Sequence, residues 1–160
     1  MIISAARVAQ YTKSGETPMC PFGRGYDHGG AFKHLLQVYD IFDEGWDGFF
    51  AFIDGKVVFL DRKDAMKHAI ECNQVLAGKE SYESLNSEMV SYWEKGEGLS
   101  QLEDLDYRMR DFYWAVRSNW RIKTCYPDLP ALSDDETQKI FKNVAESCKF
   151  ESCKFGSETL

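Results

Sequence analysis

The pattern of apolar and polar residues predicts β-strands at the start of the chain and around one tight turn. Ile2 to Thr12 is a short, β-compatible segment that we expect to form the first strand. In GFFAFIDGKVVFL, residues 48–60, two apolar runs flank Asp54-Gly55, a pair typical of the type I′ turn of a β-hairpin. Residues 13–30 lie between these segments and concentrate glycine and proline, which predicts a long loop.

Apolar residues at steps of three and four predict helices in the rest of the chain. The first helix has its apolar face on AFKHLLQVYDIF, from Phe32 to Phe42. Asp61 is a residue type that caps helices, and Asp64 three positions later forms a weak capping-box pattern. The predicted helices cover residues 31–42, 62–75, 84–93 and 99–123, and a last helix begins at Ser133.

These elements define an α+β fold: a small N-terminal antiparallel sheet with a hairpin, followed by packed C-terminal helices that include one long amphipathic helix. A length of 160 residues suits a single domain. We expect a core at residues 1–123 and a C-terminal helical extension with a frayed end at 124–160. The extension contains the tandem repeat ESCKFESCKF, too short for a solenoid, which we interpret as a local duplication.

Composition and charge narrow the classes of protein. A hydrophobic fraction of 44% with 14% aromatic residues excludes a disordered chain. We expect no membrane contact and a cytoplasmic location, because no apolar run is long enough for a span or a signal peptide. The five scattered cysteines form no CxxC motif and are interpreted as reduced thiols. A net charge of −7 argues against binding of duplex nucleic acid but permits a small anion in a local basic pocket.

The segment RMRDFYWAVRSNWR, residues 108–121, concentrates arginine and aromatic residues in the long predicted helix. An apolar seam recurs along the same helix at Leu102, Leu105, Met109, Phe112, Val116 and Trp120. At about 100° per residue, Arg110, Arg117 and Arg121 lie within about 40° of one another on another face, with Trp114 beside them.

Some of these arginines have acidic neighbours on the helix and others do not. Arg108 has Asp104 and Asp111 at helical spacing, and Arg110 has Asp106, so we expect ordinary surface ion pairs there.

Arg117 and Arg121 have no acid at such spacing. Either both meet carboxylates from another helix, or a dianionic ligand binds between the two guanidinium groups. In the second case Trp114 or Tyr113 could stack a base, as could Tyr92 or Trp93 from a packed helix.

The loop FGRGYDHGG, residues 22–30, is a weak phosphate-binding candidate. It lacks the Gly-Lys-Ser/Thr ending of a P-loop, but its glycines would let backbone N–H groups approach an anion, and Arg24 could assist. An ordinary irregular loop is the alternative. Cys20, His28 and His34 match no structural zinc spacing, so no metal or other cofactor is predicted. No nucleophile motif or carboxylate pair stands out, so no enzymatic activity is predicted.

The Gly-Arg pair and Asp27-His28 of this loop, followed by GFFAFIDGKVVFLDRKDAMKHAIECNQ, resemble a family of small phage proteins. Members of that family have a Gly-Arg-His/Asp loop, a hairpin that closes in Phe-x-Asp-Arg-Lys-Glu-Ala, and a helix that ends in Gln. The match spans roughly residues 1–75 and includes Phe59, Asp61, Arg62, Lys63, Ala65 and Gln74. The branch in question includes the phage anti-Thoeris sponges, which sequester cyclic ADP-ribose isomers made as immune signals. The helix ends in CNQ instead of the usual small-residue-Gly-Gln, and beyond about residue 124 the chain has no counterpart.

The resemblance implies a binding protein of an infected bacterial cell that sequesters a cyclic nucleotide without catalysis. Some relatives also hold cyclic oligonucleotides. It also implies assembly as a homodimer that can build a hexamer, with Arg62, Arg117 and Arg121 as ligand contacts. A bridge from Arg62 to a carboxylate such as Asp54 or Glu71 is the structural alternative for that residue. Two other functions stay open: a protein inhibitor of another bacterial defence enzyme that acts as an acidic nucleic-acid mimic, as an anti-CRISPR does, and a phosphodiesterase acting on the same signals.

Overall fold

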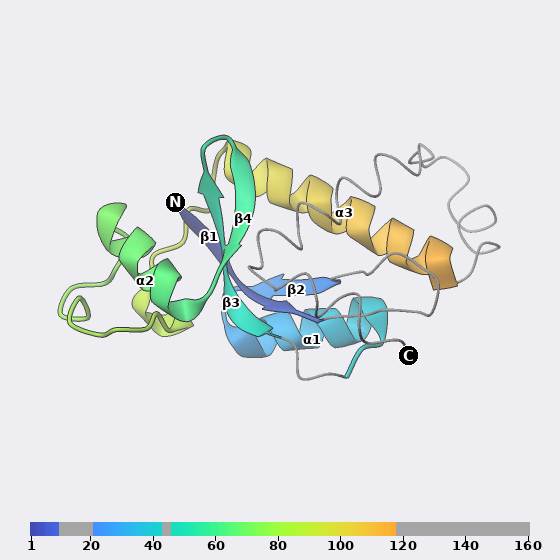
Figure 1. The fold of residues 1–160 in the computed structure, drawn as a ribbon, viewed down its shortest axis with the longest axis horizontal. Coiled ribbons are helices and arrows are strands. Elements are labelled where there is room, and N and C mark those ends of the chain that lie inside the picture. Colours follow the sequence, from blue (N-terminus) through green and yellow to red (C-terminus); the bar gives the residue numbers. More distant parts are fainter. Residues whose placement is uncertain (10–20, 43–45, 118–160) are drawn as a thin grey trace, which may run out of the picture.

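The computed structural model of the chain describes residues 1–9, 21–42 and 46–117. Four antiparallel strands form one sheet in the order β2-β1-β3-β4 (Figure 1). Their bounds are β1 Ile2–Val8, β2 Phe22–Gly25, β3 Trp46–Ile53 and β4 Lys56–Leu60. The helices are α1 His28–Tyr39, α2 Arg62–Glu71, the 3₁₀ turn η1 Ser87–Met89, and α3 Glu97–Arg117. The predicted α+β fold class is confirmed.

The hairpin between β3 and β4 forms at the predicted turn. Asp54 and Gly55 both have positive φ angles, 51° and 78°, as the two central positions of a type I′ turn require. Asp61 then caps α2, since its Oδ1 accepts a hydrogen bond of 2.8 Å from the backbone N–H of Asp64. The predicted order of strand, turn, strand, cap and helix is therefore confirmed for this part of the chain.

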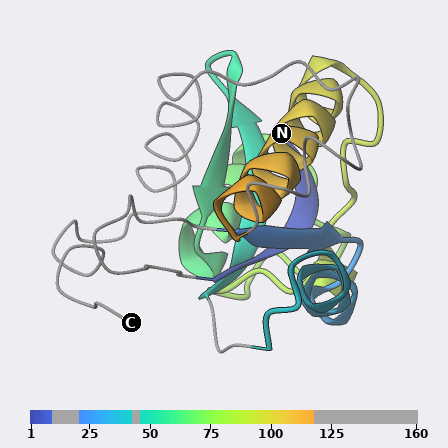
Figure 2. The ribbon, with the colours of Figure 1, turned by 90° about the vertical axis from the view of Figure 1, so that its right-hand side faces the viewer.

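The sheet separates two hydrophobic clusters, because neighbouring strand residues point to opposite faces. In Figure 1, α2 lies on one side of the sheet, and α1 and α3 lie on the other. The cluster on the α1 and α3 side includes Leu35, Tyr39, Phe50, Leu102 and Met109. The cluster on the α2 side includes Phe49, Ala65, Met66, Ala69 and Leu85. Figure 2, turned by 90°, shows α3 running diagonally across its side of the sheet.

Strand β2 corrects the prediction that residues 13–30 form a loop. Phe22–Gly25 pairs with β1, and α1 already begins at His28. A Cβ atom at Gly23 would collide with the Ala31 carbonyl group of α1. The glycines of this segment therefore permit a close approach of strand and helix, which sequence alone does not distinguish from a turn.

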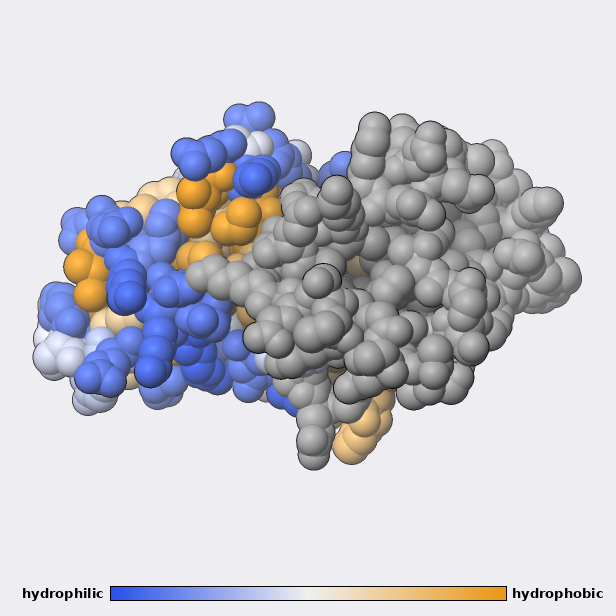
Figure 3. Space-filling model, viewed as in Figure 1, coloured by the Kyte–Doolittle hydropathy of each residue, from blue (hydrophilic) through white to orange (hydrophobic). Residues whose placement is uncertain are grey.

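The first predicted helix ends earlier than expected. Asp40 adopts a left-handed conformation with φ 55°, and its N–H donates to Leu36 O at 2.9 Å, which closes the helix. Phe42 is consequently 78% exposed and does not belong to the helix's apolar face. On the face shown in Figure 3, hydrophilic residues cover most of the coloured area, and hydrophobic residues show over the hairpin and near α2.

The helix predicted at residues 84–93 is wrong. Only η1 is helical there, and the residues after it are extended, with Val90 bridged to Val75. Two backbone hydrogen bonds of 2.8 Å, from Leu76 N to Met89 O and from Ser91 N to Gln74 O, fix the pairing. β-Branched and aromatic residues in MVSYW favour an extended chain, and this pairing outweighs their helical spacing.

The remaining predicted elements are partly described. Helix α2 ends at Glu71, short of residue 75, and Asn73 follows with φ 56°. Helix α3 begins at Glu97, and in the predicted seam Leu102 and Met109 are buried. The predicted extension of this helix to residue 123, the last helix and the tandem repeat lie outside the described residues.

Gln74, which the resemblance includes, connects three segments of the fold. Its Oε1 accepts from the Ile2 N–H at 2.6 Å, and its Nε2 donates to Ile2 O and Ser91 O, each at 2.9 Å. The side chain is 4% exposed, and all these contacts are to backbone groups. Gln74, which follows α2, therefore joins β1 to the extended segment that contains Ser91.

Candidate functional site

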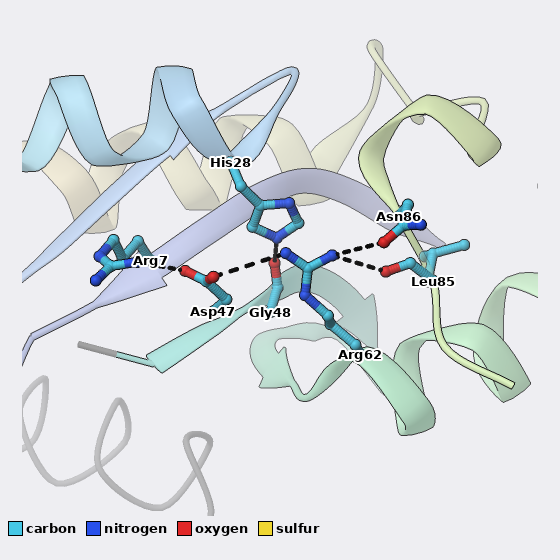
Figure 4. A network of polar contacts seen from close by, with 7 residues as sticks. All are labelled: Arg7, His28, Asp47, Gly48, Arg62, Leu85 and Asn86. Carbon is cyan, nitrogen blue, oxygen red and sulfur yellow. Dashed lines mark hydrogen bonds and ion pairs between the residues drawn. The ribbon is translucent and has the colours of Figure 1, made fainter. Parts of the chain in front are cut away.

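The N-terminus of α2 lies in a polar network that joins it to β1, to α1, to β3 and to the segment before η1 (Figure 4). Arg62 is the first residue of α2, and its Nη1 donates to Leu85 O at 3.2 Å and to Asn86 Oδ1 at 2.9 Å. Its Nη2 lies 3.6 Å from Asp47 Oδ2, which is longer than a hydrogen bond. Arg62 thus connects α2 to the segment before η1 and to the start of β3.

Asp47 connects two guanidinium groups. Its Oδ1 accepts a hydrogen bond of 2.8 Å from Arg7 Nη1, while Oδ2 faces Arg62. Arg7 also lies over the Phe32 ring, with its Cζ 5.1 Å from the ring centroid. The carboxylate is about one-third exposed, so solvent weakens both ion pairs.

His28 stands at the start of α1 and points toward the same network (Figure 4). Its Nε2 donates to Gly48 O at 2.8 Å, because a carbonyl oxygen can only accept. Burial, and secondarily the nearby positive charge of Arg62, lower the pKa of His28 below its usual value. The imidazole is therefore neutral at pH 7, with its proton on Nε2.

Two tyrosines lie beside these polar groups. Tyr26 is 71% exposed, and its ring centroid is 6.2 Å from that of Tyr92. Tyr92 in turn lies 6.4 Å from Phe49, whose ring also meets His28 edge-on at 4.9 Å. Burial raises the pKa of Tyr92, so its hydroxyl group stays protonated. We call Tyr26, His28, Asp47, Arg62 and Tyr92 the corner site.

The corner site lies where α1 and α2 both begin. Asp27 caps α1 by accepting from Gly30 N at 2.5 Å, and Asp61 caps α2 in the same way. The first turn of a helix presents backbone N–H groups that attract anions, although each cap occupies one of them. Cationic side chains and aromatic rings therefore surround the starts of two helices. This arrangement suits a ligand that carries both a phosphate group and an aromatic base.

A second charged cluster lies between β2, α1 and α3, and we call it the Asp106 cluster. Asp106 Oδ2 is 3.8 Å from Arg24 Nε, and Oδ1 is 3.7 Å from His34 Nε2. Burial raises the pKa of Asp106, while His34, Arg24 and Arg110 oppose that rise. Within the described part of the chain, Asp106 Oδ1, Arg24 Nε and the hydroxyl of Tyr39 are buried without a hydrogen-bond partner.

The Asp106 cluster corrects one predicted ion pair and leaves another intact. Asp106 faces β2 and α1 instead of forming the expected surface pair with Arg110. Arg110 Nε instead lies 3.7 Å from Asp111 Oδ1. The pair between Arg108 and Asp104 is confirmed at 3.0 Å. Helical spacing alone could not show that the Asp106 face packs against another element.

Of the predicted ligand residues, the structure brings Arg62 and Tyr92 together. Arg24 instead lies in the Asp106 cluster, and Trp93 packs on the other side of the sheet, 5.7 Å from Phe52. The predicted bridge from Arg62 to Asp54 or Glu71 is replaced by the contact with Asp47.

The predicted ligand residues of the arginine stripe are described only in part. The backbone of Arg117 ends α3, its side chain and that of Trp114 are not described, and Arg121 lies outside the described residues.

Tyr26, Asp47 and Asn86 were not predicted as site residues, and His28 was considered as a metal ligand and as part of the loop motif that the resemblance rests on, but not as a ligand contact. Tyr26 and His28 stand in the glycine-rich segment, and their position between β2 and α1 was the available signal. Nothing in the sequence marked Asp47 or Asn86, because their importance depends on which strands and turns meet.

In the described ranges, no three side chains of His, Cys, Asp or Glu gather as a metal site. None of the helices described there is long and apolar enough to cross a membrane. Comparison of the chain with protein-family models, with curated proteins and with solved structures finds no match.

Proposed function

We propose that this protein captures a cyclic nucleotide immune signal, such as a cyclic ADP-ribose isomer, and holds it without cleaving it. One observation carries the proposal: the two motifs behind the resemblance lie side by side at the corner site. His28 belongs to the first motif and Arg62 to the second, and the charge of Arg62 affects the pKa of His28. Segments far apart in sequence thus supply one cationic and aromatic surface.

The chemistry of the corner site fits such a ligand. Among the residues that the structure describes, Nη2 of Arg62 faces Asp47 Oδ2 at 3.6 Å without a hydrogen bond, so this guanidinium nitrogen can donate to a phosphate. The exposed Tyr26 ring, supported by Tyr92, offers a face on which a base can stack. Arg117 and Arg121 are proposed as the second phosphate contact, as the sequence predicts.

The proposed activity is sequestration by a phage protein inside an infected bacterium. The sequence holds no recognisable nucleophile motif, and His28, with a lowered pKa, hydrogen-bonds a backbone carbonyl. These features support binding rather than hydrolysis.

A thermal-shift panel of cyclic ADP-ribose isomers and cyclic oligonucleotides tests the proposal, because a tight ligand raises the melting temperature by mass action. The retained nucleotide is then released by heat and analysed. Nucleotide returned unchanged supports a sponge, and altered nucleotide indicates a phosphodiesterase. If no nucleotide in the panel is retained, the proposal is wrong and the protein-inhibitor alternative gains support.

Replacement of Tyr26 by alanine locates the site. We expect a loss of roughly 1–3 kcal/mol of binding free energy, the range for one base–aromatic stack. The melting temperature without ligand should change little, since Tyr26 is 71% exposed. Tyr82→Ala is the matched control, because Tyr82 is also exposed, at 49%, and lies outside the corner site. Equal affinities of the two variants in isothermal titration calorimetry would place the ligand elsewhere.

A further inference from the structure

Asp47 places a negative charge beside the guanidinium nitrogen that can donate to a phosphate. Its Oδ1 accepts the hydrogen bond of 2.8 Å from Arg7, but its Oδ2 faces Nη2 of Arg62 at 3.6 Å without a hydrogen bond (Figure 4). The carboxylate is 35% exposed. One of its oxygens is therefore directed at the place where a phosphate bound to Arg62 would lie.

A phosphate held by Nη2 of Arg62 lies close to this carboxylate in any orientation. A charge-assisted hydrogen bond from Nη2 places a phosphate oxygen about 2.9 Å away. Because Asp47 Oδ2 is 3.6 Å from the same nitrogen, that phosphate oxygen lies within about 6.5 Å of Oδ2. This separation is shorter than the screening length of about 8 Å at physiological ionic strength, so the two negative charges repel each other.

The neighbouring side chains add little positive charge to offset that repulsion. His28 is neutral, and Arg7 is already hydrogen-bonded to Asp47. The negative charge of Asp27, like that of Asp47, also acts on His28. Carboxylates of the corner therefore balance much of the attraction that Arg62 exerts on an anion.

Phosphate groups differ in the charge that they bring to such a site. A phosphate that is bonded to two groups, which we call bridged, carries one negative charge, and every phosphate of a cyclic nucleotide is bridged. The terminal phosphate of a linear nucleotide is a monoester with a second pKa of about 6, so at pH 7 it carries a charge of about −1.5 to −2. Its second charge is attracted by Arg62 but repelled by Asp47.

We propose that Asp47 is a specificity-determining residue of the corner site, which accepts bridged phosphates and disfavours terminal ones. This inference rests on the function proposed above and gives it a selectivity: a cyclic signal is held in preference to linear nucleotides that share its base and sugar. Repulsion of the wrong ligand by a like charge is a general source of specificity. If Asp47 only oriented Arg7 and Arg62, its loss would affect both kinds of ligand equally.

The test compares two probes that differ by one methyl group: adenosine 5′-monophosphate, whose phosphate is terminal, and its phosphate methyl ester, whose phosphate is bridged. Isothermal titration calorimetry at pH 7 measures the affinity of each probe for the wild type and for Asp47→Asn. The amide keeps an oxygen that can accept from Arg7 but loses the charge. We expect the ratio of the two affinities to shift by roughly tenfold toward the monophosphate, as for removal of one partly exposed charge a few ångströms away.

Asp54→Asn is the matched control. It removes the same charge beyond the other end of β3, and Asn-Gly suits the type I′ turn as well as Asp-Gly does. The ratio of the two affinities should therefore equal that of the wild type. An equal shift in both variants would mean that net charge alone is responsible, which overturns the inference.

Circular dichroism first establishes that Asp47→Asn is folded. If it is not, Asp27→Asn replaces it, because asparagine also caps helices, and a smaller shift in the same direction is expected. An unchanged ratio overturns the inference, and retention of cyclic ADP-ribose isomers by the wild type would then leave the proposed function standing. If the wild type retains no nucleotide but Asp47→Asn binds the monophosphate, the proposed function is wrong and the role of Asp47 is supported. If neither protein binds either probe, Asp47 is not what excludes terminal phosphates and the inference is overturned.

Discussion

The corner site and the Asp106 cluster each join cationic side chains to one aspartate, but their contacts differ. At the corner, Asp47 is 35% exposed and receives a hydrogen bond of 2.8 Å from Arg7. Asp106 is 21% exposed, and its two cationic neighbours lie at 3.7 and 3.8 Å. The more buried carboxylate has the poorer partners, so its desolvation is less well compensated.

The same difference applies to Arg62 and Arg24, the two arginines in the N-terminal half of the chain that were predicted as ligand contacts. Nη2 of Arg62 lies 3.6 Å from Asp47, beyond hydrogen-bond distance. Arg62 also lies near Tyr92, whose ring is 6.2 Å from that of the exposed Tyr26. Arg24 faces Asp106, a carboxylate of the protein itself, whose charge also acts on the buried Tyr39 hydroxyl. A ligand at the Asp106 cluster would have to compete with Asp106, which makes the corner site the better candidate.

The largest expected effect comes from Arg62→Ala. Its loss removes two charge-assisted hydrogen bonds and one weak ion pair, so we expect unfolding free energy to fall by about 3 kcal/mol. Chemical denaturation without ligand measures this change, and Lys63→Ala, exposed on the next residue, is the matched control. Unchanged stability of the Arg62 variant would contradict the structural role that these contacts indicate.

The same variant also tests the ligand role. The thermal shift caused by nucleotide should be smaller than in the wild type, because the available guanidinium nitrogen is lost. A full ligand-induced rise on a lower starting melting temperature would mean that Arg62 only supports the fold.

Arg117→Ala and Arg121→Ala should each weaken nucleotide capture by roughly 1.5–3 kcal/mol, the range for hydrogen bonds to charged groups. Folding should change little, since neither residue has an acid at helical spacing. Calorimetric titration of the double variant measures the combined effect, with Arg108→Ala as control because Arg108 is paired with Asp104. Wild-type affinity in the double variant would confine the ligand to the corner site.

Local patterns were sufficient for the hairpin, its turn and the α2 cap, because Asp54, Gly55 and Asp61 act through neighbours in sequence. They failed where contacts between distant segments decide the structure. The extended segment around Val90 depends on pairing with Val75, and β2 depends on the close packing of Gly23 against α1.

The residues of the candidate site could likewise be predicted only where neighbours in sequence determine them. Arg62 was expected from the hairpin-to-helix motif, but its partners Asp47 and Asn86 come from other segments. Likewise, Asp106 was assigned to its own helix because the sequence gives no sign that β2 and α1 face it.

The pH dependence of stability reports on the Asp106 cluster. The pKa of Asp106 is raised in the folded chain, chiefly by burial, so the folded state binds that proton more readily than the unfolded state. This contribution lowers stability as the pH rises from about 3.9, the unfolded value, through the raised folded value. Glu103 adds to the rise, and Asp111, whose pKa is also raised by burial, acts in the same direction.

Asp106→Asn should therefore have the smallest effect at neutral pH, a change in unfolding free energy within about 1 kcal/mol. The amide removes an incompletely compensated charge but also the only carboxylate that faces both Arg24 and His34 among the described contacts. Denaturation midpoints measured from pH 4 to pH 8 should show a flatter loss of stability with rising pH than in the wild type. Asp104→Asn, at a 62% exposed surface pair, is the control and should follow the wild-type profile. A large loss of stability at pH 7 would instead mean that the long contacts of Asp106 stabilise the fold as strongly as those of Arg62.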